Sequence, residues 1–202
     1  MLVKTIRELS KKKYKIVLSS GENFSLYKTE INTYGLREEH EISPEIYDEI
    51  MNNVLPKRAK LYAMNLLKAR PYTVRGLRDK LSEAEYPERI ADIAVNYVSS
   101  YGYLDDQKYA EDFIYTYKGR KSTKRMRYEL FQKGVSKEMI DKAFETGEAA
   151  DVSECEEEQI RKFLQKKGYF DTEFTFDEKN KLKAALYRKG YDAGMIEQVI
   201  ST

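Results

Sequence analysis

Apolar and polar residues alternate in the N-terminal part of the chain, on both sides of a polar loop at residues 19–23. The apolar members of this alternation are Tyr14, Ile16, Leu18, Phe24 and Leu26. A period of two is typical of half-buried strands, so the pattern predicts a β-hairpin. Residues 31–36 are candidates for a short third element, and we expect no helix in residues 1–35.

The pattern changes to a helical period after residue 43. Ser43 followed by Pro44 is typical of a helix start, because serine caps the first turn and proline fits its first position. From Leu55 onward, apolar residues recur every three or four positions in stripes that are separated by start and stop signals. The first three stripes end at Gly102, and a charged linker precedes the last three.

This grouping predicts the fold class. We expect a mainly α-helical protein in which three tandem three-helix repeats form an elongated curved solenoid, with a small module containing the β-hairpin at its N-terminus. The predicted domain boundaries are residues 1–54 for this module and residues 55–104, 105–150 and 151–202 for the three repeats.

Helix starts are predicted from capping residues and from acidic residues in first turns. The predicted starts lie at Thr73, Pro87, Asp105, Ser122, Ser136, Asp177 and Asp192, and at a capping box formed by Ser153 and Glu156. For the adjacent carboxylates Asp105 and Asp106, this structural role is favoured over binding a metal or a partner's arginine.

Two helix ends are closely similar in sequence. Lys133-Gly134-Val135 and Lys189-Gly190-Tyr191 each place lysine in the last turn, glycine just beyond it and an apolar residue next. Glycine accepts the left-handed conformation that ends a helix, and lysine is favoured at the negative end of the helix dipole. A weaker copy in the first repeat has Glu85 where the glycine would stand.

Charge is distributed unevenly along the chain, although the net charge is only +2. Residues 1–54 carry 8 Lys and Arg against 9 Asp and Glu, residues 55–134 carry 17 against 10, and residues 135–202 carry 11 against 15. Long-range attraction depends on the local field, so the basic middle favours contact with phosphate or with an acidic surface.

A basic run forms the main candidate binding site. Six cations stand within residues 118–127 with no acid among them: Lys118, Arg120, Lys121, Lys124, Arg125 and Arg127. Their mutual repulsion is uncompensated within the run, and an anionic partner would relieve it. Three arginines at a corresponding edge of the first repeat add to the set: Arg70, Arg75 and Arg78. The alternative is an ordinary solvated helix face.

Tyrosines are abundant, and exposed tyrosines can stack on nucleobases. Those on the apolar stripes are predicted to be core residues with their hydroxyls at the surface: Tyr97, Tyr101, Tyr109 and Tyr117. Those off the stripes are candidate contact residues: Tyr72, Tyr115 and Tyr128.

Catalytic and cofactor motifs find little support in the sequence. The single histidine, His40, stands among glutamates, and the single cysteine, Cys155, has neither a second thiol nor a neighbouring histidine. There is no phosphate-binding loop of the GxxxxGK[ST] type and no GxGxxG. We therefore expect no enzyme activity, no cofactor and no metal. The chain also lacks an apolar stretch of membrane-spanning length, and we expect a cytoplasmic protein that contacts no membrane.

Several of these residues carry a family resemblance. Gly102-Tyr103-Leu104-Asp105-Asp106, Tyr109-Ala110, Phe113, Glu129-Leu130 and Lys133-Gly134-Val135 resemble the signature of RecX regulatory proteins. The resemblance covers about residues 55–202, and the N-terminal module is similar to the extension of the longer members. The loop at residues 118–124 and an aromatic, acidic insert at residues 169–176 depart from the family pattern.

The resemblance implies a function and partners. Members of the family modulate, and usually inhibit, the RecA recombinase by binding along its filament on DNA. The implied partners are therefore a RecA-type recombinase filament and single-stranded DNA, with double-stranded DNA as a further candidate, and we expect a monomer. The resemblance implies roles in DNA repair, recombination and the SOS response.

Two alternatives remain at this stage. A helix-turn-helix protein could bind DNA directly, with residues 123–133 as the recognition helix and no recombinase partner. Three unequal repeats without a dimer heptad favour the filament regulator over this alternative. A scaffold without affinity for nucleic acid would leave the basic run as a solvated edge.

Overall fold

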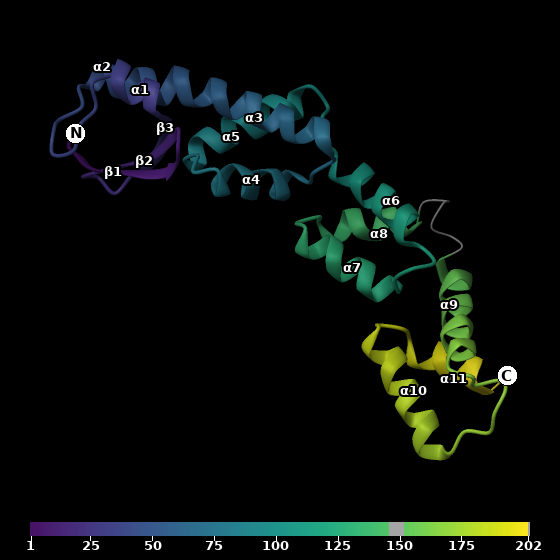
Figure 1. Cartoon of the computed structure of the whole chain (residues 1–202). Helices are drawn as coiled ribbons and strands as arrows, with labels where there is room; N and C mark the ends of the chain where they lie inside the picture. Colours follow the sequence, from purple (N-terminus) through teal and green to yellow (C-terminus); the bar gives the residue numbers. More distant parts are fainter. Residues whose placement is uncertain (146–151, 202) are drawn as a thin grey trace. The chain divides into compact units, whose positions relative to one another are not determined.

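The computed structural model describes residues 1–145 and 152–201, which form two compact units (Figure 1). Unit 1 is Met1–Asp105 and unit 2 is Asp106–Thr202. Unit 1 holds a small sheet and the helices up to residue 100, and unit 2 is helical.

The sheet of unit 1 is antiparallel and has the order β1-β2-β3. Strands β2 (Lys13–Leu18) and β3 (Asn23–Tyr27) pair with Ile16 opposite Phe24, which confirms the predicted hairpin. Strand β1 (Val3–Ser10) extends the hairpin on the other side of β2 and was not predicted. It is an edge strand whose second half is exposed, so it lacks the apolar alternation that marks a half-buried strand.

A short helix follows the sheet and corrects the expectation that residues 1–35 contain none. Helix α1 (Lys28–Thr33) begins where the Glu30 carboxylate accepts a hydrogen bond of 2.7 Å from the backbone N–H of Tyr27. Its one buried side chain is Ile31, which packs into the core of unit 1. One apolar residue gives no helical period, and for this reason the pattern of the sequence missed this helix.

Helix α2 (Pro44–Glu49) begins as predicted, because the Ser43 side chain accepts a hydrogen bond from the N–H of Ile46. It continues through η1 (Ile50–Val54), a π-helical turn, into α3 (Leu55–Ala69), with helical backbone angles at both junctions. Pro56 lacks an N–H and its ring crowds the preceding turn, so a widened turn lets the helix pass it. The predicted boundary between residues 54 and 55 falls inside this continuous helix.

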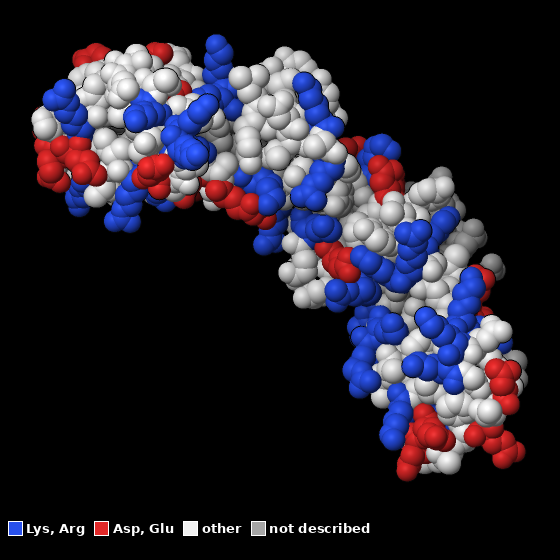
Figure 2. Space-filling model, viewed as in Figure 1, with Lys and Arg blue, Asp and Glu red and all other residues white. Residues whose placement is uncertain are grey.

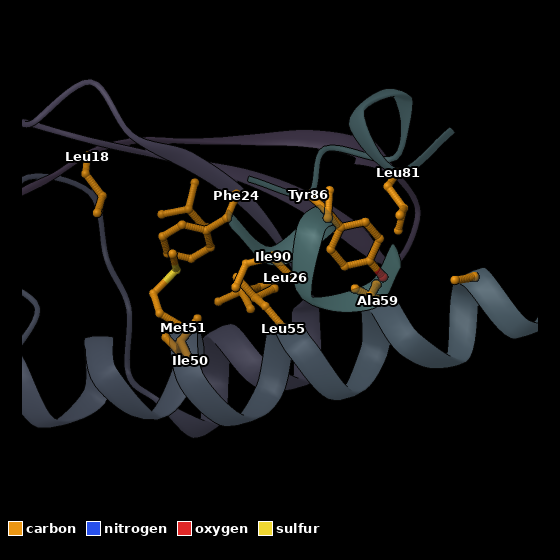
Figure 3. Close-up of a cluster of buried hydrophobic side chains, with 14 of the residues drawn as sticks. Leu18, Phe24, Leu26, Ile50, Met51, Leu55, Ala59, Leu81, Tyr86 and Ile90 are labelled. Atoms are coloured by element: carbon orange, nitrogen blue, oxygen red, sulfur yellow. The ribbon is translucent and has the colours of Figure 1, made fainter. Parts of the chain in front are cut away.

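Helices α4 (Val74–Glu83) and α5 (Glu88–Ser100) complete unit 1. Thr73 caps α4 as predicted, by accepting a hydrogen bond of 3.0 Å from the N–H of Gly76. A single hydrophobic core runs from the sheet to these helices. Figure 3 shows Leu18, Phe24 and Leu26 of the sheet beside side chains of the helices. The N-terminal module therefore shares its core with the first three-helix group.

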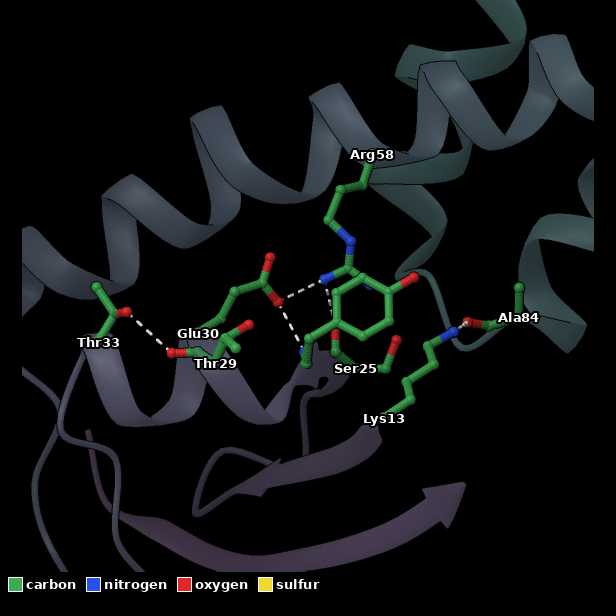
Figure 4. Close-up of polar contacts among 8 residues, drawn as sticks. Lys13, Ser25, Thr29, Glu30, Thr33, Arg58 and Ala84 are labelled. Carbon is green, nitrogen blue, oxygen red and sulfur yellow. Dashed lines mark hydrogen bonds and ion pairs between the residues drawn. The ribbon is translucent and has the colours of Figure 1, made fainter. Parts of the chain in front are cut away.

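Polar contacts join the sheet to the helices at two places (Figure 4). The Arg58 guanidinium of α3 donates to the Ser25 carbonyl at 3.3 Å and to the Glu30 carboxylate at 2.8 Å. On the other side, the Lys13 ammonium donates to the carbonyl of Ala84 at 2.7 Å. Burial and the nearby charge of Arg58 lower the pKa of Lys13. The Arg58 contacts fix β3 and α1 against α3, and the Lys13 contact fixes the sheet against the end of α4.

Unit 2 contains two three-helix groups, each with its own core. The first consists of α6 (Asp106–Tyr117), α7 (Thr123–Gln132) and α8 (Lys137–Glu145). The second consists of α9 (Val152–Lys166), α10 (Phe176–Arg188) and α11 (Ala193–Ser201).

The starts of these helices agree with most of the predicted caps. Ser122 caps α7, Ser136 caps α8, and Asp192 accepts hydrogen bonds at the start of α11. Helix α10 begins at Thr175 rather than Asp177, because Thr175 and Glu178 form a reciprocal capping box. The insert at residues 169–176 contributes Tyr169, whose hydroxyl donates to the Ile200 carbonyl at 3.1 Å. The side chain of Ser153 lies outside the described residues.

The predicted helix ends are confirmed. Gly134 and Gly190 have φ of +87° and +92°, and Glu85 adopts the same left-handed conformation at +61°. In all three cases the next residue donates its N–H back to the carbonyl of a leucine in the last turn, and its side chain is buried. The apolar residues that fold back in this way are Tyr86, Val135 and Tyr191.

Two contacts join the three-helix groups of unit 2 at the start of α7. The Ser122 hydroxyl donates to the Lys189 carbonyl at 2.9 Å, and the Glu156 carboxylate of α9 accepts a hydrogen bond from the N–H of Thr123. Gly190 lies so close that a Cβ atom there would be 2.6 Å from the Ser122 hydroxyl oxygen. The junction therefore requires glycine for its space as well as for its backbone angle.

This junction predicts unequal costs for two glycine substitutions. Gly168→Ala introduces alanine at φ +74° into open space, so it should lower the free energy of unfolding by about 1 kcal/mol. Gly190→Ala has the same backbone penalty and must also displace Ser122, so we expect a further loss of about 1 kcal/mol or more. Urea unfolding of both variants measures the difference, and equal losses would contradict the junction described above.

The buried carboxyl group of Glu156 at the same junction should make the stability of the protein depend on pH. Burial raises the pKa of this carboxyl, which is 8% exposed, and Asp192 raises it further. Because the folded-state pKa lies above the unfolded value, the contribution of Glu156 to stability is full below the unfolded pKa and is lost as pH rises through the folded one. Glu156→Gln keeps an oxygen acceptor for Thr123 and cannot ionise.

We therefore expect the variant to gain stability relative to the unmodified protein as pH increases from about 4 to about 7. Thermal unfolding of both proteins across this range measures the gain. A constant difference in stability would show that Glu156 titrates alike in the folded and unfolded states.

Candidate polyanion-binding surface

The basic run spans the turn that follows α6 and the first half of α7, so it is not a single helix face. Gly119 turns the chain with φ of +78°, and Ser122 begins α7. Figure 2 shows lysine and arginine side chains gathered over and beside α7 on the viewed face, with few acidic side chains among them. The run therefore presents three cations from the turn and three from α7.

Half of the run is compensated by acids from outside it, which corrects the sequence interpretation. The Glu129 carboxylate pairs with Lys121 at 2.5 Å and with Arg125 at 2.7 Å, and Arg127 pairs with Asp141. Burial alone would raise the pKa of Glu129, but its hydrogen bonds and the charges of the two cations outweigh burial, and the pKa is lowered. Glu129 is therefore a charged partner of the run.

The side chain of Lys121 supports the packing of two helices. Its ammonium lies 3.7 Å from the centroid of the Tyr117 ring and 5.2 Å from that of Phe113, in addition to its ion pair with Glu129. An ammonium held over two rings and a carboxylate stabilises the packing of α6 against α7. This cation is less available to a partner than its place in the run suggests.

The pair of Arg127 and Asp141 belongs to a pattern that recurs in every three-helix group. Each group has a cation seven residues before the left-handed residue and an acid seven residues after it, 14 residues apart. The pairs are Arg78 with Asp92, Arg127 with Asp141, and Lys183 with Glu197. Each pair joins the second helix of its group to the third, so Arg78 and Arg127 each help to hold together the helices of their own group.

The remaining candidate cations are of two kinds, those without a side-chain partner among the described residues and those that lie over a tyrosine ring. Arg75 and Arg120 are exposed and have no ionic or hydrogen-bonding side-chain partner within residues 1–145 and 152–201. Lys124 is exposed and its ammonium lies 5.6 Å from the centroid of the Tyr187 ring. Two more cations lie over tyrosine rings, Lys118 over Tyr115 at 5.1 Å and Arg70 over Tyr72 at 4.7 Å.

Arg75 and Lys124 occupy equivalent positions. Each stands ten residues before the left-handed residue of its group, in the first turn of the second helix. An exposed cation at the start of this helix is therefore repeated in the first two groups, and Arg120 lies close to it in sequence in the second. These three residues are the strongest candidates for contact with an anionic partner.

The tyrosines divide almost as the sequence predicts. Tyr115 and Tyr128, which lie off the stripes, are exposed, and Tyr72 is half-buried. Of the tyrosines on the stripes, Tyr101 corrects the prediction because it is 61% exposed, whereas the other three are half-buried. The stripe of α5 continues to residue 101, but Tyr101 is not among the residues that form the core of unit 1 or pack against it.

Metal binding and membrane spanning find no support in the described part of the chain. No group of three His, Cys, Asp or Glu side chains there lies close enough together to hold a metal ion. No described helix combines the length and the apolar character that crossing a membrane requires. Asp106 is the first residue of α6, in agreement with the structural role predicted for the acidic pair.

Comparison with known families identifies the class of protein. Models for the first, second and third three-helix domains of RecX match residues 59–97, 105–143 and 154–200. These matches cover more than half of the chain and coincide with the three helix groups. The chain belongs to the RecX family of regulatory proteins.

Individual relatives agree over nearly the full length. The chain is 29% identical over 202 residues to the regulatory protein RecX of Caldanaerobacter subterraneus subsp. tengcongensis, covering 100% of this chain and 98% of the relative. It is 25% identical over 199 residues to a RecX of Clostridium botulinum, covering 96% and 92%.

Solved structures show the same fold. A crystal structure of a regulatory protein RecX matches with a TM-score of 0.64 at 19% identity, covering 100% of this chain and 99% of the other. The crystal structure of RecX from Lactobacillus salivarius matches with a TM-score of 0.59 at 20% identity, covering 73% and 96%.

The two kinds of cation predict different responses to neutralisation. Lys121→Met removes an ion pair and two ring contacts, so it should lower the free energy of unfolding by about 1 kcal/mol. Arg120→Met removes an exposed charge one residue away and should change stability by less than about 0.5 kcal/mol. Chemical unfolding of the two variants tests this difference. If both variants are equally stable, Lys121 does not support the packing of α6 on α7.

Proposed function

We propose that this regulatory protein binds a RecA-type recombinase filament on DNA and inhibits the recombinase. Membership in the RecX family across all three helix groups carries this proposal. The protein acts by binding, without catalysis or a cofactor, as a cytoplasmic monomer. DNA repair, recombination and the SOS response are the processes in which a regulator of this kind acts.

The exposed cations suggest how the protein engages the filament. Arg75 lies in unit 1, and Arg120 and Lys124 lie in unit 2, so contacts with one polyanionic partner would be made by both units. A filament repeats the same protomer and the same phosphate backbone along its length, and it offers equivalent sites to equivalent cations. These side chains would contact DNA phosphates or acidic grooves of the recombinase.

Inhibition follows from binding to more than one protomer. A ligand shifts an assembly only through its different affinities for two states of that assembly. A protein that holds neighbouring protomers in one arrangement therefore opposes the extension or rearrangement that filament activity requires. Neither unit needs a catalytic residue for this effect.

The helix-turn-helix alternative is disfavoured by the surroundings of α7. A recognition helix inserts its N-terminal residues into the major groove. At the start of α7, Ser122 is instead buried and Thr123 donates its N–H to Glu156 of the third helix group, although the side chain of Lys124 is exposed. Direct insertion of this end would require the junction within unit 2 to open.

The experiment measures recombinase ATPase and strand exchange on single-stranded DNA. We expect the unmodified protein to inhibit at substoichiometric amounts and the triple variant Arg75→Gln, Arg120→Gln, Lys124→Gln to require much higher concentrations. If the cations meet DNA phosphates, the slope of log affinity against log salt should flatten by about 0.7 for each phosphate that a substituted side chain no longer neutralises. If they meet the recombinase, filament binding should fall while affinity for free DNA is unchanged.

A matched control removes the same amount of charge elsewhere. Lys11, Lys137 and Lys142 are exposed and lie outside the candidate set, so replacing all three with glutamine should leave inhibition unchanged. An equal decrease of inhibition in both triple variants would mean that total charge, and not these positions, determines binding. Absence of inhibition by the unmodified protein at every ratio would refute the proposed function.

A further inference from the structure

Three neighbouring tyrosines form an aromatic surface in unit 1, which we call the tyrosine ledge: the half-buried Tyr97 and the exposed Tyr101 and Tyr103. The ring centroids of Tyr97 and Tyr101 lie 5.1 Å apart in an edge arrangement, and those of Tyr101 and Tyr103 lie 6.1 Å apart with their planes within 19° of parallel. Tyr101 is 61% exposed and Tyr103 is 57% exposed. The ledge therefore presents open ring faces to solvent.

The turn after α5 holds these rings outside the core. Gly102 has φ of +71°, and the N–H of Tyr103 donates to the Val98 carbonyl at 3.1 Å. The same backbone bond follows the left-handed residues 85, 134 and 190, and there the next side chain folds back and is buried. An apolar residue at this position usually packs on the helix that it ends. Tyr103 keeps the backbone motif without that burial.

Lysines and shallow hollows surround the ledge along α3. One hollow of about 180 Å³ is lined by Met64, Leu67, Lys68 and Tyr103. A second, of about 380 Å³, includes Lys57, Lys60 and Tyr97 in its lining. The Lys60 ammonium lies 4.7 Å from the centroid of the Tyr97 ring. Among residues 1–145 and 152–201, none that lines either hollow is acidic.

This combination has a specific chemical complement. Open tyrosine faces attract flat, apolar π-systems, and lysines without acidic partners in the lining attract anions. A single nucleic-acid strand supplies both along its length, because each unit has an unpaired base and a phosphate. An acidic protein segment would satisfy the lysines but would use the rings only where it carried aromatic or aliphatic side chains.

We propose that the tyrosine ledge binds unpaired nucleobases of a single strand by stacking, with the lysines of α3 placed against the adjoining phosphates. The ledge and its lysines do not include Arg75, Arg120 or Lys124, and this proposal does not depend on a recombinase partner. Stacking is sequence-tolerant, since every base has a π-face, so the ledge would distinguish single strands from duplexes without selecting a sequence.

The test compares an oligothymidylate with an abasic strand of the same length, which keeps the phosphates and lacks the bases. We expect the unmodified protein to bind the oligothymidylate more tightly than the abasic strand. Tyr101→Ala with Tyr103→Ala should lower affinity for the oligothymidylate by about tenfold or more and leave the abasic strand unaffected. Tyr101→Phe with Tyr103→Phe keeps the rings and should keep the affinity.

Phe131→Ala with Phe176→Ala is the matched control. These phenylalanines lie in unit 2 and are also exposed, at 60% and 79%, so their removal should leave the preference for bases unchanged. Circular dichroism verifies the fold of every variant.

A second measurement avoids truncation altogether. Because the chain contains no tryptophan, Tyr101→Trp places a single tryptophan on the ledge, and the oligothymidylate but not the abasic strand should quench its fluorescence, excited at wavelengths that tyrosine does not absorb.

Several outcomes would overturn the proposal. Equal binding of both strands by the unmodified protein would show that bases make no contact. Unchanged affinity in the double alanine variant, together with weaker binding to the recombinase in the absence of DNA, would identify the ledge as a protein contact. If the preference for bases persists while inhibition of the recombinase fails, the ledge stands and the proposed function falls.

Discussion

The tight reversal after the second helix of each group is the constraint on which the repeats depend. A left-handed residue at 85, 134 or 190 ends the helix and directs the next side chain back into the core. The reversal also brings a cation seven residues before it opposite an acid seven residues after it, which produces the three ion pairs of identical spacing. The exposed first turn of the second helix, with Arg75 or Lys124, is positioned by the same geometry.

The first group departs from this pattern where the N-terminal sheet meets it. Glu85 adopts the left-handed conformation at a cost of roughly 1 kcal/mol, which glycine would avoid. Its carboxylate pairs with Lys15 of β2 at 2.6 Å, and the preceding residue, Ala84, accepts the hydrogen bond from Lys13. The strained residue Glu85 therefore belongs to the contact that fixes the sheet. Replacing it with glycine would leave Lys15 without this charged partner.

Short-range signals explain how much of the fold could be predicted. The helices from residue 55 onward follow from local periodicity, caps and helix ends, all of which operate within one or two turns. Strand β1 and helix α1 were missed because they bury few side chains of their own and are stabilised by partners elsewhere in unit 1. The continuity of α2 with α3 was also missed, because the widened turn that joins the two helices has no sequence signal.

The candidate site was only partly predictable, because charge in a short window does not show which cations are already paired. Asp141 lies 14 residues from Arg127, on another helix, although the repetition of that spacing in three groups is visible in the sequence. Tyr101 was placed in the core because the apolar stripe of α5 reaches it, whereas the core of unit 1 does not include it. In both cases the missing information is the position of a neighbouring helix.

Pairing within the fold also limits what the basic charge can do. If Arg75, Arg120 and Lys124 each neutralise one phosphate of a single strand, at about 0.7 in the salt slope for each, the affinity that these three contribute falls only about 20-fold between 50 and 200 mM salt. The decrease is far larger for a protein that neutralises about six to ten phosphates. Cations in this number attract a polyanion without holding it tightly. Lasting attachment must therefore come from contacts that salt does not screen, such as apolar or aromatic side chains against bases or a protein groove.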